Sequence, residues 1–137
     1  MKAHLDALKA RIILVGITPH IGQVPRGATM PFASLSGPGW DSGDDLAICG
    51  PGAELVADVR VLVTHTTESN VYVALDKLRE ELTPNLDPTR LVVPGRYAVV
   101  EFLRSEFVMT DRDVTYGETN RHPGYGVDTY RITSHPA

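Results

Sequence analysis

A long alternation of apolar and polar residues, beginning at Glu54, limits what this sequence can fold into more than any other feature. The two sides of the alternation are Leu55, Ala57, Val59, Val61 and Val63 against Asp58, Arg60, Thr64 and Thr66. A period of two is typical of a β-strand that buries one face. The thirteen residues 54–66 would span about 43 Å at roughly 3.3 Å per residue, whereas most strands have about five or six residues.

The predicted strand is long compared with the chain itself. The sequence has 137 residues, which fits a single domain over residues 1–137. A compact chain of this length has a radius of gyration near ~14 Å, and so a diameter of about 37 Å. A strand longer than its own globule must bend or reach beyond it. We therefore expect extended segments to project from a small core and to be buried against other copies of the chain.

Charge and composition exclude several classes of protein. The net charge of −4 argues against a protein that grips nucleic acid through its phosphates, because such binding needs clustered Lys and Arg. It leaves open a protein that surrounds DNA without holding it. Cys49 stands alone, which excludes a disulfide framework and a thiolate metal site. The apolar run from Ile12 is too short to span a bilayer, and the N-terminus lacks a signal-peptide core. We expect an intracellular soluble domain with no membrane contact.

Two segments repeat their apolar residues at helical spacing. The first, over residues 2–15, carries its stripe at Leu5, Leu8, Ile12 and Val15 and ends at Gly16. The second, over residues 67–82, carries Val71, Ala74, Leu75, Leu78 and Leu82. Thr67 or Ser69 is the expected N-cap of the second helix, and Pro84 ends it.

The remaining segments are predicted as strands and loops. Residues 20–24 and 30–36 are expected to form two adjoining short strands, residues 83–96 a Pro-rich connection, residues 97–116 a long strand region and residues 126–134 a final strand. The segment GETNRHPGYG, residues 117–126, is predicted as a hairpin loop. This order predicts an α+β fold. It has a mostly antiparallel mixed sheet of four to six strands, two amphipathic helices on one face, and projecting long strands or a hairpin.

Reactive-looking groups do not assemble into a recognisable catalytic motif. The histidines show no helical pair and no Cys partners, so solvent-exposed or strand-edge positions are expected rather than a zinc site: His4, His20, His65, His122 and His135. Asp111 and Asp113 flank Arg112 with a period that puts both carboxylates on one face. A magnesium site is one interpretation; charged pairs with Arg112 and Arg121, between hairpin arms or between subunits, are the simpler one. We predict no enzyme activity and no cofactor.

Loop residues are the better candidates for interaction with other proteins. Trp40 lies in a Gly-rich loop, where it is either an anchor folded onto the domain or an interface anchor. Projecting polar loops on a rigid sheet commonly carry recognition. The loop residues favoured on this ground are Asp111, Arg112, Asp113, Asn120, Arg121 and His122.

The order of these segments resembles that of the tail terminator proteins of long-tailed phages with flexible tails, the lambda-type minor tail protein U group. The resemblance runs through a G-x-x-P step at Gly22-Gln23-Val24-Pro25 and a strand at Pro31-Phe32-Ala33-Ser34-Leu35. A Gly-rich loop, the long alternating strand and the second helix follow. The pattern closes with TDRDVTY, a hairpin loop and a strand at Asp128-Thr129-Tyr130-Arg131-Ile132-Thr133. The connection over residues 84–96 and the segment ICGPG depart from this pattern.

The resemblance implies a structural protein that forms a hexameric ring on the head-proximal end of the phage tail. Such a ring stops addition of tail tube protein and presents the surface that joins the head-completion or stopper protein. It would be assembled in the host cytoplasm and remain in the virion, with DNA passing through its lumen without specific binding. Two alternatives stay open at this point: another ring-forming head-tail connector or stopper, and a small magnesium-dependent hydrolase built on Asp111 and Asp113.

Overall fold

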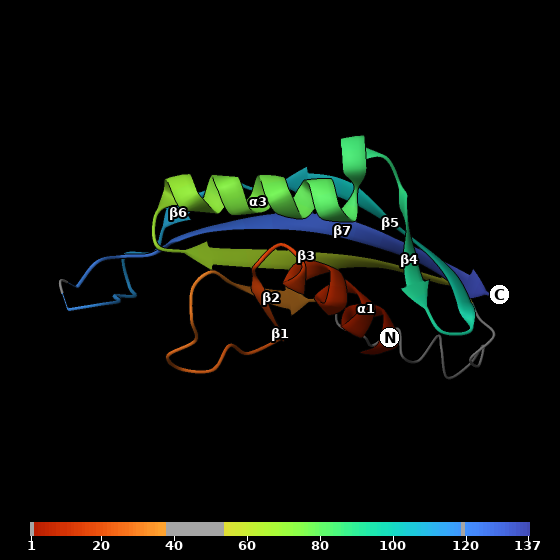
Figure 1. The fold of residues 1–137 in the computed structure, drawn as a ribbon, viewed down its shortest axis with the longest axis horizontal. Helices are drawn as coiled ribbons and strands as arrows, with labels where there is room; N and C mark the ends of the chain where they lie inside the picture. Colours follow the sequence, from red (N-terminus) through yellow and green to blue (C-terminus); the bar gives the residue numbers. More distant parts are fainter. Residues whose placement is uncertain (1, 38–53, 119) are drawn as a thin grey trace.

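A computed structural model describes residues 2–37, 54–118 and 120–137 and confirms the α+β fold (Figure 1). In chain order the elements are α1 (Lys2–Ile13), β1 (Thr18–Ile21), β2 (Phe32–Ser36), β3 (Leu55–His65), α3 (Glu68–Leu82), the 3-10 turn η2 (Pro84–Leu86), β4 (Thr89–Val93), β5 (Arg96–Ser105), β6 (Met109–Thr110) and β7 (Gly124–Pro136). Neither α-helix among these described residues is long and apolar enough to cross a membrane. The Gly-rich loop and Trp40 lie outside the described residues.

The described strands form one mixed sheet in the order β1-β2-β3-β7-β5-β4, and the short β6 pairs with β7 off this path. The β1–β2 pair is parallel and every other pair in the sheet is antiparallel. The predicted mostly antiparallel mixed sheet is therefore confirmed. Two short strands were also expected to adjoin near the N-terminus, and β1 and β2 do so.

The long predicted strand is β3, with 11 residues, and it pairs along its whole length with the 13-residue β7. The register runs from Leu55 opposite Ser134 to His65 opposite Gly124. The length of β3 is thus matched inside the chain, and β3 and β7 run side by side along the long axis of the molecule (Figure 1). Beyond one end of this sheet, residues 111–123 project as a hairpin between β6 and β7 (Figure 1).

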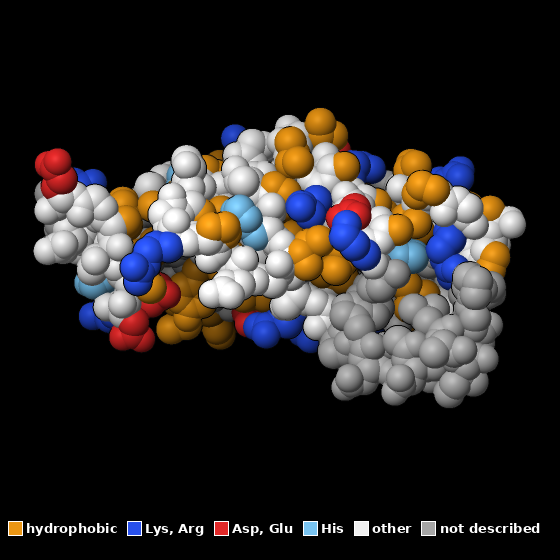
Figure 2. All heavy atoms as spheres, turned by 90° about the horizontal axis from the view of Figure 1, so that it is seen from below, with side chains coloured by type: hydrophobic (Ala, Val, Ile, Leu, Met, Phe, Trp, Pro, Cys, Tyr) orange, Lys and Arg blue, Asp and Glu red, His pale blue; other side chains and the backbone are white. Residues whose placement is uncertain are grey.

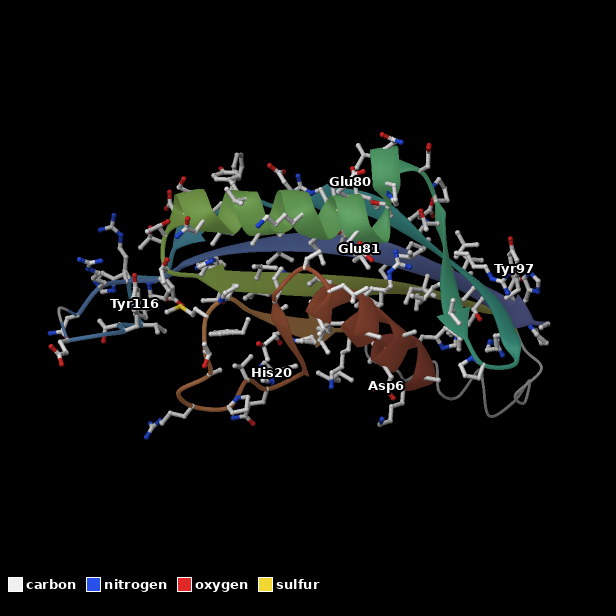
Figure 3. All side chains as sticks on the ribbon, viewed as in Figure 1. Asp6, His20, Glu80, Glu81, Tyr97 and Tyr116 are labelled. Atoms are coloured by element: carbon white, nitrogen blue, oxygen red, sulfur yellow. The ribbon has the colours of Figure 1, made fainter. Side chains whose placement is uncertain are left out.

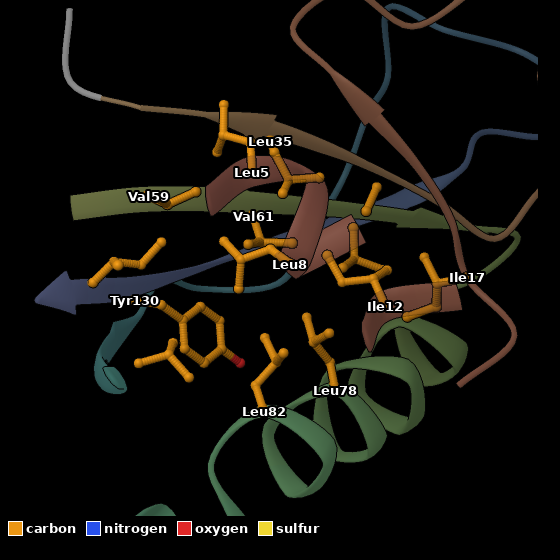
Figure 4. Packing of buried hydrophobic residues seen from close by; sticks show 14 of the residues in the cluster. Leu5, Leu8, Ile12, Ile17, Leu35, Val59, Val61, Leu78, Leu82 and Tyr130 are labelled. Atoms are coloured by element: carbon orange, nitrogen blue, oxygen red, sulfur yellow. The ribbon is translucent and has the colours of Figure 1, made fainter. Parts of the chain in front are cut away.

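Both α-helices pack on one face of the sheet, as predicted. The alternating apolar residues of β3 point toward the helices, and Figure 4 shows the two helices closing over them. The labelled members of this single cluster are Leu5, Leu8, Ile12, Ile17, Leu35, Val59, Val61, Leu78, Leu82 and Tyr130. Burial of such side chains stabilises the fold by about 1.5–3 kcal/mol each, so burial on this face supplies most of the free energy that favours folding.

Two glycines of β7 let α3 approach the sheet closely. A Cβ atom at Gly124 would lie 2.7 Å from the backbone nitrogen of Glu68, the first residue of α3. A Cβ atom at Gly126 would lie 2.9 Å from Cδ1 of Leu75. The start of α3 is fixed by its N-cap Thr67, whose hydroxyl accepts the backbone N–H of Asn70. Side chains at these glycines would push the helix away from β7.

A buried charge ties α3 to the middle of the sheet. The carboxylate of Asp128 on β7 is fully buried, and the guanidinium of Arg79 on α3 binds both of its oxygens, at 2.7 and 3.0 Å. Tyr130 donates its hydroxyl to the same carboxylate at 3.3 Å, and Arg79 lies 5.3 Å from the centre of the Phe102 ring on β5. The hydrogen bonds to Asp128 raise the pKa of Arg79, and burial raises the pKa of Tyr130. The network joins three elements through paired polar groups.

His4 is an exception to the expectation of exposed or strand-edge histidines. It is buried on α1, and its Nε2 lies 2.8 Å from the hydroxyl of Ser134, which also accepts a hydrogen bond from Arg96 at 2.6 Å. The helical stripe of α1 therefore contains an imidazole beside its apolar residues. Burial, reinforced by positive charge near the ring, lowers the pKa of His4 to about 4.

Two segments differ from the prediction. Residues 83–96, expected to be an irregular connection, contain β4, which pairs with β5 from Thr89 opposite Val100 to Val93 opposite Arg96. The strand was missed because prolines lie on both sides of it; proline is tolerated next to a short edge strand such as β4. The predicted strand region 97–116 is interrupted after Ser105; pairing resumes at Met109 and Thr110 and in the isolated bridge of Tyr116.

Arg79→Ala removes the cation that pairs with the buried carboxylate. We expect the free energy of unfolding to fall by about 3–5 kcal/mol, because Asp128 stays buried without a charge partner. Urea denaturation measures this change. Lys77→Ala, at an exposed position of the same helix, is the control and should change the free energy by less than about 0.5 kcal/mol. Equal effects of the two substitutions would contradict the role given to Arg79.

The lowered pKa of His4 predicts a pH dependence of stability. The unfolded chain takes up this proton near pH 6.5 and the folded chain only near pH 4, so the contribution is complete above pH 6.5 and is lost as the pH falls toward 4. We expect His4→Leu to flatten the rise of the unfolding free energy over this range by up to about 3 kcal/mol. The exposed His135 provides the control, His135→Gln. Identical pH profiles for all three proteins would contradict the account.

Candidate interaction surface

The face of the sheet opposite the α-helices is the most extensive surface on which to look for a site. It consists of the residues of β3, β4, β5 and β7 that alternate with the core residues, and we call it the open face. Exposed apolar side chains occur at several of its positions, with Val56 58% exposed and Val92 76% exposed. Exposed apolar residues that form a contiguous patch mark interaction sites more often than single ones do.

Charged pairs occupy the middle of the open face. Arg131 on β7 donates to Asp58 on β3 at 2.8 Å, and Arg60 lies 3.3 Å from Glu106 just after β5. The hydrogen bond from Arg131 to Asp58 raises the pKa of Arg131. Exposed pairs of this kind contribute little to stability. These charged pairs lie between the two ends of the face.

One end of the open face lies beside the projecting hairpin. Leu62 of β3 and Tyr125 of β7 line a depression there together with Asp111 and Asp113. Met109 pairs with Tyr125 across the β6–β7 ladder, and the Tyr125 hydroxyl lies 3.7 Å from its sulfur. Seen from below, hydrophobic side chains gather next to the hairpin and are flanked by acidic and basic side chains (Figure 2).

Phe107 is the most exposed large apolar residue of this end, at 90%. It lies in the short break between β5 and β6, where its neighbour Val108 turns toward the core and would contact a side chain at Gly126. Phe107 and Met109 flank Val108 and are both exposed. Phe107 also lines a depression with Tyr72 of α3, so it lies at the edge of this end that is nearest the helix. The hairpin-end patch is defined as Leu62, Phe107, Met109, Asp111, Asp113 and Tyr125.

The other end of the open face lies at the turn between β4 and β5. Tyr97 is 44% exposed and stacks on His135, with ring centres 5.2 Å apart, and the Arg90 guanidinium lies 5.3 Å from the centre of the Tyr97 ring. Val92 pairs with Tyr97 across the β4–β5 ladder. The turn-end patch is defined as Arg90, Val92, Tyr97 and His135. Tyr97 and the hairpin residue Tyr116 are labelled at opposite ends of the molecule in Figure 3.

The hairpin itself is held by a few backbone and side-chain contacts. Tyr116 and Arg121 form an isolated antiparallel bridge, and the chain turns between them with Gly117 and Asn120 at positive φ. The Tyr116 hydroxyl donates to the backbone oxygen of Thr66 at 2.8 Å, which ties the hairpin to the junction of β3 and α3. The described ends of the hairpin are therefore tied to each other and to the sheet.

The structure brings six of the seven predicted interaction residues together on this hairpin. They are Asp111, Arg112, Asp113, Asn120, Arg121 and His122. The backbone N–H of Asp113 donates to Asp111 Oδ1 at 3.1 Å, and His122 Nδ1 lies 2.8 Å from the Val114 oxygen. No ion pair joins Arg112 or Arg121 to another described residue, so the pairing between hairpin arms does not form. Pairing between subunits stays a prediction, as does a role for Trp40.

The described part of the structure does not support the interpretation of Asp111 and Asp113 as a magnesium site. Asp111 and Asp113 line one depression, but the described part of the chain brings no group of three or more His, Cys, Asp or Glu side chains into metal-binding proximity. An octahedral Mg²⁺ site usually uses one or two carboxylates with substrate phosphates and water. The two aspartates alone do not define such a site.

Sequence reasoning missed the turn-end patch and the apolar part of the hairpin-end patch. One feature of the sequence could have indicated Phe107: it is an aromatic residue at the point where the strand alternation breaks. No feature of the sequence indicated Arg90 and Tyr97, because they come from separate strands and meet only through the β4–β5 pairing.

Comparison with known proteins gives a match of fold. No protein-family model matches the chain, and no curated protein matches it. Among solved structures, the chain is similar to a chain from the virion of a native gene transfer agent (GTA) particle. That match has a TM-score of 0.50 and 17% sequence identity, and it covers 93% of this chain and 84% of the other. The match establishes a shared fold over nearly the full chain.

Proposed function

We propose that this chain is a structural subunit of a phage-like virion, and specifically a tail terminator. Six copies form a ring on the head-proximal end of the tail tube. The ring stops further addition of tube protein and presents the surface that the head-completion or stopper protein joins. No catalytic step is part of this function.

The match of fold to a GTA virion chain is the observation that carries the proposal. It spans 93% of this chain, so it covers nearly the whole fold rather than one common motif. Because the matched chain is part of a virion and shares this fold, a structural role is favoured for this chain. The segment order shared with tail terminators adds the position on the tail.

The shape of the subunit also supports a ring. A closed rotational ring needs two different surfaces on each subunit, one complementary to the other on its neighbour. The hairpin-end patch and the turn-end patch are two such surfaces at opposite ends of an elongated sheet (Figure 3). A ring lumen that carries DNA should also bind it weakly, which agrees with the net charge of −4.

Light scattering on the purified full chain, together with electron microscopy of particles, tests this proposal. We expect a species with six times the mass of one chain that binds the end of isolated tail tubes. We also expect particles that lack the protein to carry tails longer than the normal length. A protein that stays monomeric at high concentration and ignores tube ends would contradict the proposal.

The same micrographs separate the terminator from a different connector. The virion match does not specify a position, so a head-tail connector or stopper is the competing assignment. A terminator should be found on tails that lack heads. Labelled protein on heads that lack tails, and never on tails alone, would replace the terminator with the connector.

A further inference from the structure

The two patches on the open face have complementary charge. At the hairpin end, Asp111 and Asp113 form no ion pair with another described residue. At the turn end, Arg90 is exposed and stacks on Tyr97, and it too has no carboxylate partner among the described residues. The hairpin also carries Arg112 and Arg121, which form no ion pair with another described residue, so the complementarity is between the two aspartates of one patch and Arg90 of the other.

The apolar parts of the patches supply contact area. Phe107 and Met109 are 90% and 52% exposed at the hairpin end, and Val92 and Tyr97 are 76% and 44% exposed at the turn end. Exposed aromatic residues rimmed by charged groups are typical anchors of protein interfaces. Both patches have this composition, an apolar centre beside unpaired charge.

We infer that copies of this chain join head to tail, with the hairpin-end patch of one copy bound to the turn-end patch of the next. The inference rests on the proposed ring and identifies the surfaces that close it. In it, Asp111 and Asp113 pair with Arg90 of the neighbouring copy, and Phe107 and Met109 pack against the exposed apolar side chains of β4 and β5.

A second copy is favoured as the occupant because this chain itself carries both complementary surfaces. A two-fold contact centred on the turn-end patch is disfavoured, because it would place Arg90 against its own copy. Like charges at such distances repel and cost free energy. A contact between the two different patches avoids this repulsion and is the heterologous contact that a ring requires.

Charge reversal tests the inference. We compare the full-length chain with the variant Asp111→Arg/Asp113→Arg and with the variant Arg90→Asp by light scattering over a concentration series. Each variant alone should associate at least about tenfold more weakly than the original chain. An equal mixture of the two variants should recover assembly. In that mixture, intact patches meet at alternate contacts and reversed charges meet at the others.

Two controls separate the interface from folding. Glu80→Lys reverses an exposed charge on α3, away from the open face, and should leave association unchanged. Phe107→Ser should weaken association, whereas Leu86→Ser, which replaces a side chain that is 60% exposed in η2, should not. Thermal midpoints measured by circular dichroism should match for all variants.

The outcomes also separate this inference from the proposed function. A hexameric original chain whose reversal variants stay hexameric overturns the head-to-tail surfaces and leaves the terminator role in place. Variants that dissociate singly but fail to recover on mixing overturn it as well. A monomeric original chain that does not bind tube ends overturns both.

Discussion

The close packing of α3 against the β3–β7 ladder is the constraint on which the rest of the structure depends. Gly124 and Gly126 remove the side chains that would hold the helix away, and the Arg79–Asp128 pair fixes its position along β7. A buried carboxylate is tolerated only with a hydrogen-bonded partner, so this pair specifies one arrangement of helix and sheet. With α3 in place, α1 completes the same layer, and the main hydrophobic cluster lies between the helices and the sheet.

This packing decides which surfaces are left for other molecules. Since both α-helices lie on one face, the alternate residues of the long strands face away from them. Val127 and Thr129 in the middle of β7 are nevertheless buried, whereas Val56, Val92 and Tyr97 are exposed. Strands of 11 and 13 residues then carry two patches to opposite ends of the open face, with ion pairs between them. The length of β3 is thus explained in two steps. Pairing with β7 stabilises it within the chain, and its reach separates the two surfaces that a ring subunit needs.

Local patterns predicted the parts of the fold that have a strong period. The alternation from Glu54 located β3, and the helical spacing located α3 with its N-cap at Thr67. The hairpin residues were predicted together because turn residues mark them. The strand β4 was missed because prolines surround it, and His4 was misplaced because burial of an imidazole depends on Ser134, far along the chain. The turn-end patch depends on pairing between strands, which no local pattern contains.

Disulfide trapping between subunits is the most direct measurement of the central claim, that elongated subunits close a ring end to end. A chain with Cys49→Ser, Asp111→Cys and Arg90→Cys places one thiol in each patch. Because these positions lie at opposite ends of one molecule, a bond between them must join two copies. Under mild oxidation the account predicts a ladder of linked chains that ends at six, and single substitutions that stay unlinked. Chains that stay unlinked while the assembly remains intact would contradict it.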